Sequence, residues 1–398
     1  MNGPAVTGPF VLGTALAERE QVGLLRNRIA TDGASGGRLR VAGRDYLNFS
    51  ANDYLGLADH PAIKAAFNAG VECYGTGSGA SPLVTGYSRA HQQLEETLAE
   101  WLGVEAVLLF NCGFSANQAV LKALLGKEHL LWQDKLNHAS LQEMGSQLPC
   151  KMKRFAHNDM AALERQLEPN RGLIVSEGVF SMDGDQAPWG ELAILAARSG
   201  NWLMIDDAHG LGVLGPEGRG TLAAQGVNPA NVHIQMGTFG KALGVAGAFV
   251  GGSRELVEYL VNFARHYVYS THMPAAQACA VSKSIELVRA ADESRAHLGQ
   301  LIARFRQGAK DQGWQLGASD TPIQPLLVGE SSVALQLAER LRERGVWVSA
   351  IRPPTVPVGT ARLRITLSAA HREQDVERLL DALGVCPAVT TLGEAHYG

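Results

Sequence analysis

Two charged residues in apolar surroundings, Asp206 and Lys241, are the first candidates for chemistry. Asp206 ends the apolar run NWLMI, where an unpaired carboxylate would be costly, so it needs a cation or several hydrogen-bond donors. Lys241 lies in GTFGKALGVAGAF, which holds no other charge, and burial there would lower its pKa and leave the free amine that Schiff-base chemistry requires. A buried carboxylate facing a protonated pyridine nitrogen is typical of pyridoxal phosphate sites. A purely structural interpretation, in which Asp206 caps a turn and pairs with Lys241, fits the spacing equally well.

Five short apolar segments are predicted to be the strands that position these residues, with helices at 114–125, 159–168 and 190–199 between them. This alternation predicts an α/β fold whose mostly parallel sheet is covered on both faces. Ligands of such sheets bind beyond the carboxyl ends of the strands. Polar, titratable or glycine-rich residues follow all five predicted strands, at 106–110, 129–132, 172–177, 201–206 and 232–237.

One glycine pattern resembles a dinucleotide-binding fingerprint but lacks its context. Gly210, Gly212 and Gly215 have the right spacing after a strand, yet Pro216 follows at once and the next residues predict a turn. A true fingerprint opens a helix and has an acidic residue at the end of the next strand. We therefore expect no nicotinamide site here. The chain also contains no P-loop motif and no G-x-S-x-G nucleophile motif.

Composition excludes several classes of protein. The chain has 398 residues, which allows two or three domains, and its 46% hydrophobic and 19% charged content exclude a disordered protein. A net charge of −4 argues against nucleic acid as a partner. The five cysteines form no Cys-x-x-Cys pair, which indicates a reducing compartment and no metal site. Without a basic leader or a long apolar run, we expect a cytoplasmic protein with no membrane span.

Three regions are expected along the chain. Residues 1–49 contain a predicted helix at 17–30 and nearly all of a predicted hairpin at 36–50, and residues 50–288 are expected to form the large α/β domain. The pattern changes in 289–398, which predicts a smaller α+β domain. Its expected elements are a helix through Val333, Leu337 and Leu341, strands at 346–350 and 362–368, and a helix at 375–383, before a loose tail from Cys386.

The segment TFGKA at 238–242 resembles the lysine motif of the α-oxoamine synthases, which are pyridoxal-phosphate enzymes of fold type I. Further similar segments lie, in the right order, at 46–57, 77–95, 177–185, 205–215, 269–274 and 351–371. The resemblance spans about residues 20–385 and implies a large domain with a seven-stranded type of sheet. Within the family, LVTGYS, KRFAHND and IRPPTVP are most similar to the biotin-pathway members, which condense L-alanine with a pimeloyl thioester and release CO2.

The resemblance implies roles at the cofactor. Lys241 would form the Schiff base and move the Cα proton, Asp206 would keep the pyridine nitrogen protonated, and His138 would stack on the ring. Together with His209, these are the expected catalytic residues. The other expected contacts are His209 and Ser181 to the phenolic oxygen, and Gly113, Phe114 and Thr238 to the phosphate, with Ser270 and Thr271 reaching the phosphate from a partner subunit of a homodimer.

The resemblance also implies substrate contacts. Arg364 would clamp the amino-acid carboxylate, with Asn52 and His138 near the reacting carbon, and Arg26 and Thr355 would meet the acyl thioester. The acyl group could arrive on coenzyme A or on an acyl carrier protein. The basic cluster at 151–154 is expected to be a solvated strand edge, with carrier-protein docking as the less favoured alternative.

Several alternatives stay open. A sister synthase would use glycine or serine with another acyl thioester, a non-catalytic homologue would act as a binding subunit, and a dehydrogenase would bind a nucleotide. Arg362 is expected to face away from Arg364 into solvent. We expect a structural role for His157, at the surface or in the core, while Glu177 could equally be structural or support the site.

Overall fold

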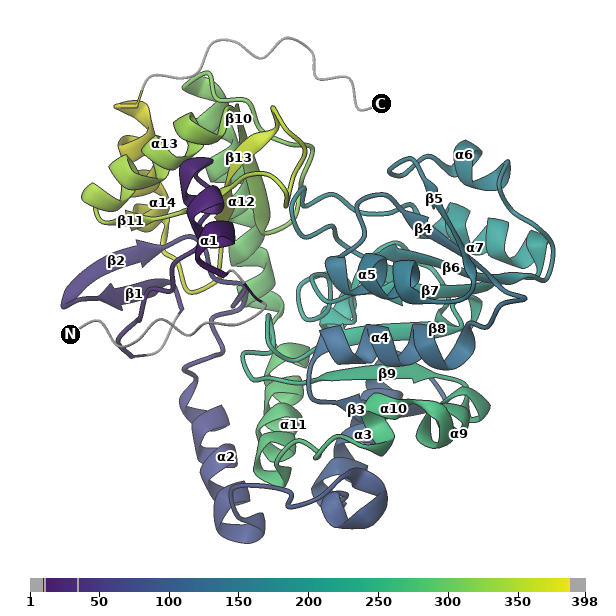
Figure 1. Cartoon of the computed structure of the whole chain (residues 1–398). Coiled ribbons are helices and arrows are strands. Elements are labelled where there is room, and N and C mark those ends of the chain that lie inside the picture. The colour runs from purple at the N-terminus through teal and green to yellow at the C-terminus, as the bar shows by residue number, and fades with distance from the viewer. Residues whose placement is uncertain (1–9, 11, 34–35, 387–398) are drawn as a thin grey trace.

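Seven strands form the main sheet of the computed structural model, which describes residues 10, 12–33 and 36–386 (Figure 1). Neighbouring strands are parallel except at β9, which runs antiparallel to both β3 and β8. The strands, in spatial order, are β3 (Ala106–Phe110), β9 (Ala248–Gly252), β8 (Ile234–Thr238), β7 (Trp202–Asp206), β6 (Gly172–Glu177), β4 (Leu130–Asp134) and β5 (Lys151–Phe155).

Both faces of this sheet are buried, as the apolar strands predict. Leu173 and Val175 of β6 pack into one hydrophobic cluster, while Ile174 between them packs into another on the opposite face. The helices that supply the rest of these layers are α4 (Gly113–Leu124), α5 (Ala139–Gln147), α6 (Met160–Glu164), α7 (Trp189–Ser199), α8 (Thr221–Ala224), α9 (Arg254–Phe263) and α10 (Arg265–Val268).

A smaller antiparallel sheet lies at the C-terminal end of the chain, in the order β10 (Ile323–Gly329), β13 (Ala361–Thr366) and β12 (Ser349–Ile351). A third sheet joins the N-terminal hairpin to this region. Its strands are β1 (Arg38–Val41), β2 (Arg44–Asn48) and β11 (Val346–Trp347), and the neighbouring helices are α12 (Asp292–Asp311), α13 (Ser331–Glu343) and α14 (Glu373–Gly384). The segment expected as one strand at 346–350 therefore contributes to two sheets.

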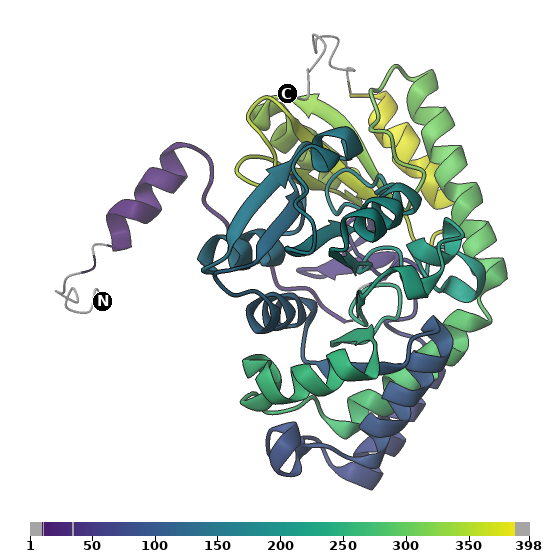
Figure 2. The ribbon, with the colours of Figure 1, turned by 90° about the vertical axis from the view of Figure 1, so that its right-hand side faces the viewer.

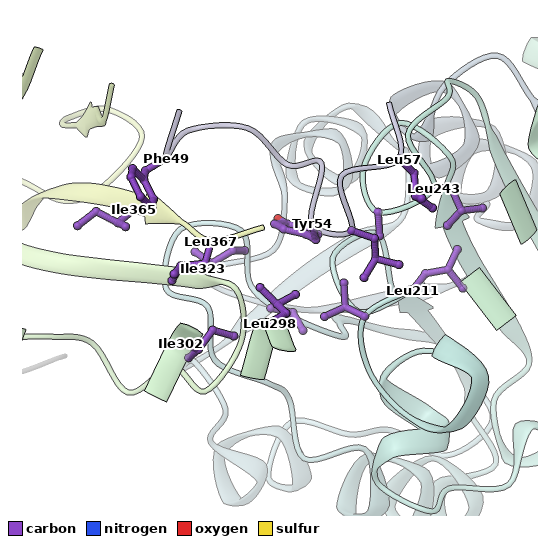
Figure 3. Packing of buried hydrophobic residues seen from close by; sticks show 14 of the residues in the cluster. Phe49, Tyr54, Leu57, Leu211, Leu243, Leu298, Ile302, Ile323, Ile365 and Leu367 are labelled. Atoms are coloured by element: carbon purple, nitrogen blue, oxygen red, sulfur yellow. The ribbon is translucent and has the colours of Figure 1, made fainter. Parts of the chain in front are cut away.

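The hydrophobic core continues between the large sheet and the C-terminal sheet. Figure 3 shows Tyr54 and Leu57 between Ile323 and Leu367 on one side and Leu243 on the other, and all belong to one buried cluster. Below this junction, two helices lie side by side (Figure 1), α2 (Pro61–Tyr74) and α11 (Ala275–Arg289). The short turn η1 (Pro82–Gly86) and α3 (Arg89–Leu102) follow α2 along the chain.

The N-terminal helix differs from the prediction. It is α1 (Leu12–Gln21), its residues are exposed, and it projects from the rest of the molecule in Figure 2. The expected span of 17–30 is wrong because Gly23 takes a positive φ of 65° just after the last turn, a conformation that ends helices. No helix within the described residues is long and apolar enough to cross a membrane.

Candidate active site

A cavity of about 200 Å³ lies at the carboxyl ends of the central strands. Its walls come from the first turns of α4, the ends of β6, β7 and β8, and the loops that follow β4, β7 and β8. The residues that line it are Gly113, Phe114, Asn117, His138, Glu177, Asp206, Ala208, His209, Met236, Thr238 and Lys241. Seven residues predicted from sequence are therefore brought to one place: Gly113, Phe114, His138, Asp206, His209, Thr238 and Lys241.

Asp206 presents a buried carboxylate to this cavity. It ends β7 with 4% of its surface exposed, and it accepts hydrogen bonds from the Asn117 Nδ2 amide (2.7 Å) and the Ala208 N–H (3.1 Å). In the described part of the chain no lysine, arginine or histidine forms an ion pair with it. The site therefore offers a carboxylate that has donors but no cation, and a cationic ligand would supply the missing charge.

Lys241 lies in the loop between β8 and β9, and its amine faces the same cavity. The Nζ atom is 3.0 Å from Nε2 of His209. Burial lowers the pKa of Lys241 to about 8, although the carboxylates of Asp206 and Glu177 act in the opposite direction. At pH 7 a pKa near 8 leaves roughly a tenth of the amine neutral, far more than for an ordinary lysine, and the neutral amine is the form that attacks a carbonyl.

A chain of hydrogen bonds connects this lysine to Arg364. Nδ1 of His209 is 2.6 Å from the Tyr54 hydroxyl, which also contacts the Asn52 amide oxygen at 3.2 Å. That oxygen accepts from both terminal nitrogens of Arg364, at 3.2 and 3.1 Å. Burial raises the pKa of Tyr54 to about 12, and burial beside Lys241 and Arg364 keeps the pKa of His209 well below its usual value, so both side chains are neutral.

The second predicted arginine of β13 does not face away from the first. Residues two apart on a strand point to the same face, so Arg362 and Arg364 share one, and both are buried, as is every residue of β13. The expectation of a solvated Arg362 is therefore wrong, and its guanidinium instead holds Asp183 at 2.5 Å. Arg364 donates from Nε to the carbonyl of Ser181 at 2.6 Å.

The other end of the cavity is formed by the start of α4. This helix begins at Gly113 without a side-chain cap, so its first N–H groups are available to an anion. His138 sits opposite, with its ring edge-on to Phe114 at 6.3 Å between centroids, and burial lowers the pKa of this histidine. Phosphate at the helix end and an aromatic ring beside His138 are therefore compatible with the walls.

Seven predicted residues do not line this cavity. Two of them, Asn52 and Arg364, are connected to His209 through Tyr54, and the other five lie elsewhere. Ser181 reaches Arg364 only through its carbonyl, and Ser270 and Thr271 line a separate small cavity with Asn111, beyond the end of β3. Arg26 and Thr355 are exposed, and neither lines either cavity.

Asn117 and Tyr54 are functional candidates that the sequence analysis missed. Asn117 is a fully buried amide on the inner face of α4, and a polar residue among Ala116, Ala119 and Val120 was the available signal. Tyr54 gave no such signal, because its partner His209 is 155 residues away in the chain.

Comparisons with known proteins agree with this geometry. The model of the aminotransferase class I and II family matches residues 44–383. A protein of Aeromonas salmonicida named 8-amino-7-oxononanoate synthase is 87% identical over 398 residues, which is the full length of both chains. This chain belongs to the 8-amino-7-oxononanoate synthase family. The resemblance to the pyridoxal-phosphate enzymes of fold type I is thereby confirmed.

Solved structures of the 8-amino-7-oxononanoate synthase family and of a sister group share this fold. The synthase of Francisella tularensis is 28% identical, with a TM-score of 0.76 over 85% of this chain and 97% of that one. Serine palmitoyltransferase from S. paucimobilis, with PLP and myriocin bound, is 26% identical, with a TM-score of 0.88 over 94% and 96% of the two chains.

Proposed function

We propose that this protein is a pyridoxal-phosphate-dependent acyltransferase that makes 8-amino-7-oxononanoate from L-alanine and a pimeloyl thioester, a step in biotin biosynthesis. The full-length identity of 87% to a protein of that name supports the product. The observation that carries the chemistry is the placement of the Lys241 amine and the Asp206 carboxylate around one cavity. The reaction releases CO2 and the free thiol, and we assign it to the cytoplasm.

The cavity fits pyridoxal phosphate. When bound, this cofactor supplies an aldehyde that captures amines and a ring that withdraws electrons from the amino-acid Cα. Lys241 would hold the aldehyde, Asp206 the ring nitrogen, and the start of α4 with Thr238 the phosphate. Two buried polar atoms of the walls, Oδ1 of Asn117 and Oε1 of Glu177, have no hydrogen-bond partner among the residues that the structure describes, as expected for groups that face a ligand.

Three residues of the chain would then have separate roles toward alanine. Arg364 would bind the alanine carboxylate with the second N–H of each terminal nitrogen, since Nε is held by Ser181 and each terminal nitrogen donates once to Asn52. Fixing the carboxylate fixes which bond at Cα stands perpendicular to the cofactor ring, so binding also sets reactivity. Lys241 would remove the Cα proton and later return one, and its lowered pKa suits both transfers. His138 would cover the ring face.

We further propose a homodimer in which Ser270 and Thr271 serve the partner's cofactor. Around the small cavity that they line, apolar side chains are exposed on η1 and after α10: Leu83 at 53%, Val84 at 72% and Tyr269 at 70%. Exposed apolar groups gathered in this way are typical of protein interfaces. Arg26 and Thr355 stay proposed contacts of the acyl thioester, which could be carried by coenzyme A or a carrier protein.

The deciding experiment is mass analysis of the product formed from alanine with pimeloyl-coenzyme A and, separately, with a pimeloyl carrier protein. We expect 8-amino-7-oxononanoate from at least one donor. Glycine and serine are run in parallel because the serine palmitoyltransferase structures share this fold. A preference for either amino acid over alanine would overturn the proposed substrate.

A further inference from the structure

His157 lies between two carboxylates from different parts of the fold. Its Nδ1 is 3.0 Å from Asp134 Oδ1 and its Nε2 is 2.7 Å from Asp185 Oδ2. Both ring nitrogens can donate at once only when the imidazole is a cation, so the arrangement is an ion-pair bridge. The ring also packs edge-on against Phe180 at 4.4 Å between centroids, which fixes its plane.

One side of this bridge holds the segment that carries His138. Asp134 ends β4, is fully buried, and accepts the backbone N–H groups of Leu136 (2.8 Å) and Asn158 (2.9 Å). His138 follows at the cavity wall, with only residues 135–137 between it and Asp134. The bridge therefore supports the turn that aims His138 at the cofactor site.

The other carboxylate of the bridge, Asp185, belongs to the loop 181–185, and this loop also contains the carbonyl that binds Arg364. Within this loop, the Ser181 carbonyl accepts from Arg364 and the Asp183 carboxylate accepts from Arg362. Asp185 anchors the far end by accepting from His157 and from the Asn158 side-chain amide, the latter at 3.1 Å. The loop is therefore tied to β13 on one side and, through His157, to the large sheet on the other.

We propose that His157 is a positioning residue for alanine binding: by bridging Asp134 and Asp185 it fixes the loop 181–185, and through the Ser181 carbonyl it fixes the guanidinium of Arg364. This role rests on the proposed function, and it lies outside the cavity itself. Loss of the His157 bridge should weaken alanine binding more than it slows the turnover of bound alanine.

The test compares His157→Gln with His233→Gln in the full-length protein. His233 is the control: it is more exposed than His157, but its ring also packs against an aromatic side chain, Trp202, and it lies just before β8, at the amino end of that strand and away from the cavity. We expect His157→Gln to raise the KM for alanine at least ten-fold, with a smaller change in kcat and in the KM for the acyl thioester. His233→Gln should leave all three within two-fold.

Hydrogen–deuterium exchange of the substrate-free proteins supplies a readout that needs no turnover. The Phe180 N–H donates to the Asp185 carbonyl, and the Gly184 N–H donates to the Phe180 carbonyl, so both hydrogen bonds close the base of the loop. These two amides should exchange faster in His157→Gln only. If His157→Gln does not fold, Asp185→Asn takes its place. Unchanged exchange, or an unchanged KM for alanine, overturns the proposal. Failure of the wild-type protein to use alanine would instead refute the proposed function, while the exchange comparison still reports on the loop.

Discussion

At the scale of single residues, the site depends on two charged groups that the fold leaves incompletely paired. Asp206 has two hydrogen-bond donors but no ion-pair partner among the described residues, and Lys241 is held near a neutral histidine rather than against a carboxylate. Each group is thereby kept available to a ligand, at a cost in stability that the surrounding core offsets. The structural alternative, a direct pair of the two, is not formed.

Replacement of Lys241 is expected to abolish turnover without unfolding the protein. Lys241→Ala should lower kcat by on the order of a thousand-fold or more, because both the amine nucleophile and the proton carrier are lost. Lys283→Ala is the control, since Lys283 lies on the surface of α11 beside Glu286. Product formation is followed by mass spectrometry, and borohydride reduction should label a peptide containing residue 241 in the wild type alone. Substantial turnover by Lys241→Ala would refute the assignment.

Two adjacent aspartates should respond differently to the same change. Asp206→Asn is expected to reduce kcat by roughly a hundred-fold or more, because a neutral amide cannot stabilise a protonated pyridine nitrogen. Asp207 instead binds the Thr221 hydroxyl (2.6 Å) and N–H (2.7 Å), and it does not line the cavity. Asp207→Asn should therefore lower the melting temperature while keeping kcat within a few-fold. Equal kcat for Asp206→Asn and the wild type would contradict the role.

The sequence was informative for residues whose chemistry is unusual for their surroundings. Asp206 stands out as a charge at the end of an apolar run and Lys241 as the single charge of its glycine-rich segment, and both line the cavity. Asn52 and Tyr54 do not stand out from their neighbours in the sequence in this way. Their importance comes from contacts with Arg364 and His209, which only the folded chain brings within reach.

At the scale of elements, apolar strands between helices were predictable and glycine-rich ones were not. The expected strands at 106–110 and 172–177 agree with β3 and β6. The strand β9, AFVGG, was missed because its two glycines and the glycine-rich loop before it resemble a turn. Its antiparallel direction is likewise invisible in a pattern of local hydrophobicity.

Close packing of α2 against α11 gives a prediction about stability. A Cβ atom at Gly70 would lie 2.6 Å from the Cα of Ala276, so Gly70→Ala should destabilise the protein by about 1–3 kcal/mol. Gly299 is also helical, and a Cβ there meets nothing within 4 Å. Gly299→Ala should instead stabilise by roughly 0.5–1 kcal/mol. Thermal and urea unfolding would measure both, and equal effects of the two variants would contradict the packing argument.

The His157 bridge predicts a pH-dependent contribution to stability. Although burial opposes it, hydrogen bonds to Asp134 and Asp185 raise the pKa of His157 from 6.5 to about 10. Because the pKa is higher in the folded state, protonated His157 stabilises the fold. This contribution to the free energy of unfolding is fully present below about pH 6.5 and is lost as the pH rises through about 10. The difference in melting temperature between the wild type and His157→Gln should therefore shrink from pH 7 to pH 10.5. A constant difference would show that the charge is unimportant.

At the scale of the whole molecule, the proposed homodimer can be tested through its exposed apolar residues. We expect a dimer in sedimentation experiments, and Val84→Glu should weaken it by about ten-fold or more, since a charge at a buried interface is costly. Ile194 on α7 is comparably exposed, at 59% against 72% for Val84, but lies on another element. Ile194→Glu should leave the assembly intact, and identical behaviour of the two variants would argue against this surface.

The reversal of direction at β9 has a consequence for how the active-site lysine works. Because β8 and β9 are antiparallel neighbours, residues 239–247 form a closed loop whose base is tied by the Phe239 N–H and the Thr238 hydroxyl to the Gly247 carbonyl. No crossover helix intervenes that could shift and carry the backbone with it. In its proposed role, Lys241 would therefore move between its positions by rotation of its own aliphatic stem rather than by a shift of the backbone that carries it.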